Sequence, residues 1–153
     1  MDTNATHEQA RLQLELFEMR REARLRQARE WVQNNYFIES FEDAMRIGAP
    51  GTEAGTNVMM VAGYWEQACA MLNHGLLHED LFFSTTGEFF MTWERMKPMV
   101  AGFRKQFANP HVFEHIEKAA ARFEEWSEKR APGHVARMRE FMKTMRPAGT
   151  KAA

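Results

Sequence analysis

Apolar residues between positions 89 and 107 recur at alternating steps of four and three. This spacing places them in one stripe along one face of an α-helix. The stripe consists of Phe89, Trp93, Met96, Val100, Phe103 and Phe107. Residues 58–72 are apolar on almost every side and are interrupted mainly by Glu66 and Gln67, which is typical of a central helix. These two patterns predict an all-α protein.

The length of 153 residues fits one domain that can bury a core without disulfides or a structural metal. No stretch of useful length alternates between apolar and polar residues as a strand would. We predict a single-domain helical bundle of five to seven helices over about residues 1–147. A long N-terminal helix is expected at about 7–33, core helices within about 56–130, and a C-terminal amphipathic helix at about 134–145. The tail at about 148–153 is expected to be disordered.

The N-terminal helix should begin after Thr6, which can form a capping box with Gln9. If it is continuous to Val32, it is roughly 40 Å long, more than the ~30 Å span of a small domain. Its apolar residues lie on two nearly opposite faces. One face contains Leu12, Leu16, Met19 and Ala23, and the other contains Leu14, Phe17, Leu25, Ala28 and Val32. Because a surface helix needs only one apolar face, we expect the second face to pack on something else.

Capping residues predict several other helix boundaries. A short helix at Phe41–Ile47 is opened by Ser40 and closed by Gly48. Residues 48–56 have the composition of a loop. The central helix should end at Asn73 or His74, because Gly75 suits a left-handed stop.

Three signals predict the boundaries of the later helices. Thr85 and Glu88 have the spacing of a second capping box, and Pro98 predicts a kink in the striped helix. Asn109 followed by Pro110 predicts the start of the next helix.

The charge balance and the single cysteine limit the function classes. The net charge is −1, so no basic field attracts nucleic acid. No apolar run reaches the ~20 residues of a membrane span, and the polar first ten residues do not form a signal peptide. Cys69 cannot form an internal disulfide, and we expect it to be a small core residue rather than a nucleophile. These features favour a cytoplasmic protein.

Two histidine pairs are candidates for metal binding. His111 and His115 fall in a His-x-x-Glu-His pattern, which could place both rings on one helix face as zinc ligands. The pattern is short, it lacks a third ligand, and basic residues follow it, so a solvated pair is the favoured interpretation and no metal is predicted. His74 and His78 are separated by Gly75, which should end the helix between them. No histidine has a glutamate three residues before it, which disfavours a di-iron bundle.

The densest basic run lies in the N-terminal helix and comprises Arg20, Arg21, Arg24, Arg26 and Arg29. Glutamates at three- and four-residue spacing interleave with it, an arrangement that forms ion pairs along a helix surface. We therefore expect a solvated face in preference to a site for phosphates or an acidic partner.

Four segments share a pattern of Arg, Trp, Gly and Leu residues. They are residues 19–24, 63–66, 74–80 and 92–95. Over about 16–126 the chain resembles a bacterial family of small helical domains of unknown function, whose members often follow N-terminal membrane helices. The resemblance implies a helical bundle in which these segments are packing motifs, and it supplies no catalytic residue. The membrane helix is expected to be missing here.

No catalytic residue, cofactor or enzymatic activity is predicted. We expect a helical protein-interaction module that forms a homodimer through Leu12, Leu16, Met19 and Ala23. Alternatively, the final helix, with Val135, Met138, Phe141, Met142 and Met145 on one face, folds back onto this stripe. A rival function is binding of a small apolar ligand or haem in a Met/Phe-lined cavity, with His74, His78 or His115 as axial ligand. A weaker option is an enzyme that uses Glu66 and a histidine.

Overall fold

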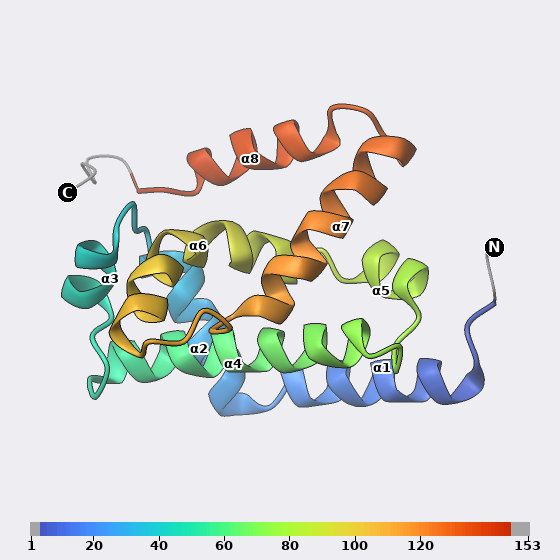
Figure 1. The fold of residues 1–153 in the computed structure, drawn as a ribbon, viewed down its shortest axis with the longest axis horizontal. Coiled ribbons are helices and arrows are strands. Elements are labelled where there is room, and N and C mark those ends of the chain that lie inside the picture. Colours follow the sequence, from blue (N-terminus) through green and yellow to red (C-terminus); the bar gives the residue numbers. More distant parts are fainter. Residues whose placement is uncertain (1–3, 148–153) are drawn as a thin grey trace.

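The computed structural model describes residues 4–147, which fold into eight α-helices without a strand (Figure 1). The helices are α1 (His7–Arg20), α2 (Ala23–Asn35), α3 (Phe41–Ile47), α4 (Glu53–Asn73), α5 (Glu79–Thr85), α6 (Glu88–Gln106), α7 (Glu114–Arg130) and α8 (His134–Thr144). The all-α prediction is confirmed. The predicted count of five to seven helices is wrong, because the expected N-terminal helix is divided into α1 and α2. The tail at 148–153 lies outside the described residues.

α4 is the helix around which the others are arranged. It packs against α2, α6 and α7, while α3 packs on α6 and α8 packs on α7. α1 and α4 run along one edge of the molecule, and α8 runs along the opposite edge (Figure 1). The described part contains no helix long and apolar enough to span a membrane.

The start of α4 corrects the predicted loop at 48–56. Thr52 caps the helix by accepting a hydrogen bond from the Gly55 N–H at 3.0 Å, so the helix begins at Glu53. A side chain at position 55 would place its Cβ 1.9 Å from the Ala49 carbonyl oxygen. The glycine is therefore required by close contact between the helix and the preceding turn, and it does not mark a loop. The predicted end at Gly75 is confirmed, since His74 is the C-cap and Gly75 has a φ of 76°.

The break between α1 and α2 occurs without glycine or proline. Thr6 forms the expected capping box with Gln9 at the start of α1. Arg21 ends α1, and the Glu22 carboxylate accepts hydrogen bonds from the N–H groups of Arg24 and Leu25, both at 2.9 Å. Glu22 thus caps α2, and these bonds hold its pKa below the usual range. A glutamate cap resembles an ordinary helical residue in sequence, which is why the break was not predicted.

The boundaries of α6 follow the sequence pattern only at its end. The helix ends at Phe107 as expected, and it continues through Pro98 as one helical segment. The capping box predicted for Thr85 and Glu88 is wrong. Thr85 donates its hydroxyl to Leu81 within α5, and Gly87 precedes α6 without a side-chain cap.

α7 begins four residues later than Asn109 and Pro110 predict. The Asn109 side chain accepts a hydrogen bond from the His111 N–H and stabilises a turn in place of the first helical turn. Phe113 follows with a φ of 56°, and the helix begins at Glu114. The cap comes from α4, where the Glu66 carboxylate accepts hydrogen bonds from the N–H groups of His115 and Ile116 at 3.0 and 2.8 Å.

Aromatic rings fill the core between α5, α6 and α7. Phe123 contacts Phe83, Phe89 and Phe90 with ring centroids 4.9–5.4 Å apart, distances typical of favourable aromatic pairs. The striped face of α6 is buried along most of its length. At its end, however, Phe107 is 61% exposed, because the stripe extends beyond the neighbouring helices.

We expect Phe123→Ala to lower the free energy of unfolding by about 3–5 kcal/mol, since it leaves a cavity inside the aromatic cluster. Phe107→Ala is the matched control at an exposed ring, and it should change stability by less than about 0.5 kcal/mol. Urea denaturation followed by circular dichroism measures both variants. Equal losses at the two positions would contradict the core assignment.

Candidate functional site

The predicted stripe on the N-terminal helix does not form one surface. Leu16 is buried and Leu12 packs partly against the core, whereas Met19 is 52% exposed. Ala23 is exposed but belongs to α2, because α1 ends at Arg20. Half of the proposed interaction face is therefore part of the intramolecular core.

The exposed apolar residues of α1 are instead Leu14, Phe17 and Met19. Leu14 is 65% exposed and Phe17 is 43% exposed. The alternative in which the final helix covers α1 is wrong. Arg139 of α8 binds Glu94 of α6 and Glu124 of α7, and α8 lies at the far edge of the molecule from α1 (Figure 1).

A cavity of about 430 Å³ lies between α1, α4 and α5, beside these exposed residues. Its walls are mostly apolar. The residues that line it are Ala10, Gln13, Leu14, Leu16, Phe17, Arg20, Tyr64, Trp65, Ala68, Leu81, Phe82, Thr85 and Thr86. Among these residues there is no histidine or methionine, so the cavity contains no axial ligand of the kind expected for haem.

Hydrogen bonds to α4 and α5 hold α1 along this cavity. The Tyr64 hydroxyl donates to the Leu16 carbonyl oxygen. The Gln13 amide donates to the Thr85 hydroxyl oxygen at 2.7 Å. Burial raises the pKa of Tyr64 to about 12, so the phenol is protonated and donates its hydrogen at neutral pH. The cavity is therefore framed by fixed side chains.

An ion cluster at the end of α1 replaces the expected solvated basic face. Glu88 of α6 accepts hydrogen bonds from Arg29 at 2.6 and 2.7 Å and from Arg20 at 3.2 Å. All three side chains are less than a fifth exposed. Two guanidinium groups thus share one carboxylate, and the cluster has a net positive charge.

The other arginines of the run differ in their surroundings. Arg24 donates to the Asn57 side chain of α4 at 2.8 Å. Arg21 pairs with Glu18 at 3.5 Å and lies over the Phe17 ring, 5.7 Å from its centroid, and Arg21, Glu18 and Arg26 are all solvent-exposed. The prediction of a solvated face is therefore correct for Arg21 and Arg26 and wrong for Arg20, Arg24 and Arg29.

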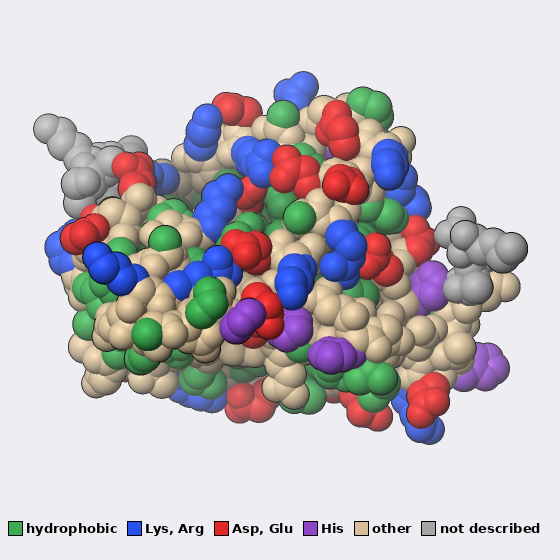
Figure 2. Space-filling view, in the orientation of Figure 1, with side chains coloured by type: hydrophobic (Ala, Val, Ile, Leu, Met, Phe, Trp, Pro, Cys, Tyr) green, Lys and Arg blue, Asp and Glu red, His purple; other side chains and the backbone are tan. Residues whose placement is uncertain are grey.

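Three of the six histidines, His74, His111 and His115, lie where α4 ends and α7 begins, and Figure 2 shows histidine side chains close together on one face. His111 lies in the turn before α7. It therefore does not share a helix face with His115, which the His-x-x-Glu-His pattern had suggested. His111 lies 3.2 Å from Glu114, while His115 contacts Asn73 and lies 5.9 Å from His74 between ring centroids. No group of three or more potential metal-ligating side chains occurs within residues 4–147.

The remaining candidate residues have structural contacts. Cys69 is fully buried, and burial raises the pKa of its thiol above the usual value, which disfavours the nucleophilic thiolate. Both carboxylate oxygens of Glu66 are occupied by the N-terminus of α7. His78 is the N-cap of α5, where its ring accepts a hydrogen bond from the Leu81 N–H at 3.2 Å.

Residues of the four sequence segments also form hydrogen bonds between helices. Asp80 accepts a hydrogen bond from the Trp126 indole N–H at 3.0 Å. Arg95 donates to the carbonyl oxygens of Val32 and Gln33, at the end of α2. The segments therefore join helices that are distant in sequence.

The sequence suggested a Met/Phe-lined cavity as a rival function, but it indicated neither the position nor the lining of this cavity. The lining comes from three helices and spans about 75 positions, and its apolar members each resemble a core residue. The one available signal was the second apolar face of the N-terminal helix, which contains Leu14 and Phe17.

Replacing Glu88 by Ala should lower the free energy of unfolding by about 2–3 kcal/mol, because it removes charged hydrogen bonds and leaves two largely buried guanidinium groups without a carboxylate. Glu18→Ala, which removes an exposed ion pair, should cost less than about 0.5 kcal/mol. Thermal and urea unfolding measure the difference. If Glu88→Ala left the free energy of unfolding unchanged, the cluster would not be what holds α1 and α2 on the bundle.

A model of a protein family described as a domain of unknown function, DUF4760, matches residues 5–123. The match runs from the start of α1 into α7 and includes all four segments on which the resemblance was based. Neither the curated proteins nor the solved structures include a match. Because the family model covers more than half of the sequence, the chain belongs to the DUF4760 family.

Proposed function

We propose that this domain is a non-enzymatic interaction module that self-associates through the exposed side of α1. One observation carries the proposal: Leu14 and Phe17 are exposed on one side of α1, and α8, the other candidate to cover it, lies at the opposite edge. Proteins seldom leave adjacent large apolar side chains in water without a partner.

A second copy of the chain fits this surface better than an unrelated partner. A two-fold interface brings the same patch of both copies together, so the patch must contain both projections and a recess. Leu14 and Phe17 project from α1, and both also border the cavity.

The contacts of the polar residues favour an interaction module over an enzyme. Glu66 caps α7, Cys69 is buried as a thiol, and His115 contacts Asn73. A nucleophile needs a neighbouring base and access to substrate. These three groups are occupied or enclosed by other parts of the bundle.

The double variant Leu14→Glu with Phe17→Glu tests the proposal. We expect the wild type to sediment as a dimer at tens of micromolar and the variant to sediment as a folded monomer, since four charges would enter the interface. Phe141→Glu, at a 60% exposed position on α8, is the matched control and should remain dimeric. Leu16 is unsuitable for this test because it is buried.

Sedimentation velocity and circular dichroism report association and folding separately. A wild-type chain that is monomeric at high micromolar concentration would contradict the proposal. So would a double variant that keeps the dimer.

A further inference from the structure

The cavity between α1, α4 and α5 is a recess that opens to solvent beside the exposed side chains Leu14 and Phe17. Ligand pockets measure about 300–1,000 Å³. The observed volume is about 430 Å³. Its inner walls include large apolar side chains that belong to the core, among them Leu16, Trp65 and Phe82.

Two buried polar atoms of cavity-lining residues have no hydrogen-bond partner in the described part of the chain. The first is the indole N–H of Trp65, whose side chain is 1% exposed. The second is the amide oxygen of Gln13, whose NH₂ group already donates to Thr85. An unsatisfied buried polar group is unfavourable, and such groups in native proteins commonly have a partner. Both residues line the cavity, but these two atoms are buried beneath its surface, so a ligand head group would meet Arg20 and not these atoms.

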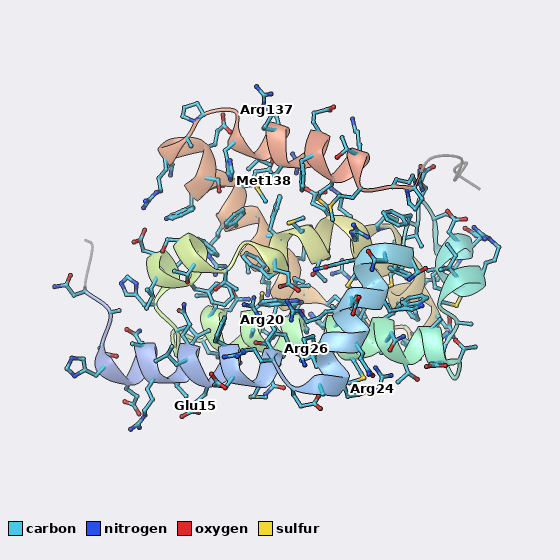
Figure 3. The ribbon with its side chains drawn as sticks, turned by 180° about the vertical axis from the view of Figure 1, so that it is seen from behind. Glu15, Arg20, Arg24, Arg26, Arg137 and Met138 are labelled. Carbon is cyan, nitrogen blue, oxygen red and sulfur yellow. The ribbon has the colours of Figure 1, made fainter. Side chains whose placement is uncertain are left out.

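The ion cluster adds positive charge beside the same cavity. The Arg20 guanidinium carbon lies 5.0 Å from the ring centroid of Phe17 and 5.9 Å from that of Trp65, and both rings line the cavity. Arg20 lies on the inner side of α1, whereas Glu15 points away from the bundle (Figure 3). Since Arg20 and Arg29 share only Glu88, one positive charge remains uncompensated within the cluster.

We propose that this cavity binds a small amphiphile with an apolar body and a carboxylate head, of the class of medium-chain fatty acids. The apolar body packs between α1 and the walls from α4 and α5. The carboxylate pairs with the Arg20 guanidinium and offsets the excess positive charge of the cluster. A cationic head would be repelled by the same arginines.

This inference does not depend on self-association, because the cavity lies within one chain. Leu14 and Phe17 line it and also belong to the proposed dimer surface, so a second copy would compete with the ligand. Binding is measured by isothermal titration calorimetry of the wild-type chain with dodecanoate, dodecanol and dodecyltrimethylammonium, each below its micelle concentration. We expect saturable one-to-one binding of dodecanoate, about tenfold or more weaker binding of dodecanol, and no saturable binding of the cation.

Variants then locate the site. Arg20→Gln should weaken dodecanoate binding about tenfold and leave dodecanol binding unchanged, because only the charged head is affected. Arg26→Gln, at an exposed arginine on α2, is the matched control and should have no effect. Ala10→Trp places a large ring at the cavity wall and should abolish binding of both ligands.

Circular dichroism establishes that each variant is folded, and the comparison of head groups on the wild type stands without any variant. Absence of saturable dodecanoate binding would overturn the proposal. Equal binding of dodecanoate and dodecanol would refute the carboxylate assignment. Unchanged binding by a folded Ala10→Trp variant would place the ligand outside this cavity.

Discussion

The bidentate bond from Arg29 to Glu88, joined by Arg20, determines how the N-terminal part of the chain meets the bundle. The two arginines are nine positions apart and belong to α1 and α2. A single carboxylate at the start of α6 can bind both only if the chain bends between them. The bend at Arg21 and Glu22 is therefore coupled to this cluster, and Glu22 stabilises it locally by capping α2.

The bend also has a consequence for the shape of the molecule. A straight helix of roughly 40 Å would project beyond a small domain. With the bend, α1 returns along α4 and α5, where Tyr64 and Gln13 bind it. Leu16 packs into the core, but the neighbouring side chains of α1 leave an open recess between α1, α4 and α5. The cavity thus results from the way in which α1 is attached.

Sequence patterns predicted the features of the fold that depend on neighbouring residues. The caps at Thr6 and Ser40, the stop at Gly75 and the burial of most of the α6 stripe are local, and all were found. Some errors arose from local caps that resemble ordinary residues, such as Glu22, and one arose where a distant group replaced the local signal. Asn109 looked like a helix cap, but Glu66 from α4 caps α7 instead, 49 and 50 positions away from its two partners. Such a contact leaves no periodic trace in the sequence.

From the sequence, the candidate site beside α1 could be predicted only to the extent that the N-terminal helix has more apolar surface than one packing face needs. Two apolar faces on one helix indicate that something besides the core must cover α1, but they do not distinguish a protein from a small molecule. In the folded protein Leu16 is buried in the core, whereas Leu14 and Phe17 lie at the rim of a recess. Interhelical contacts also placed the surplus charge of Arg20 next to that recess.

These two properties of α1 depend on the same side chains. Leu14 and Phe17 are exposed to solvent, and they also form part of the wall of the recess. A second copy that packs on Leu14 and Phe17 would therefore cover the opening through which a ligand reaches the recess. Because the two partners use the same surface, each should lower the apparent affinity of the chain for the other, and by linkage the effect is reciprocal.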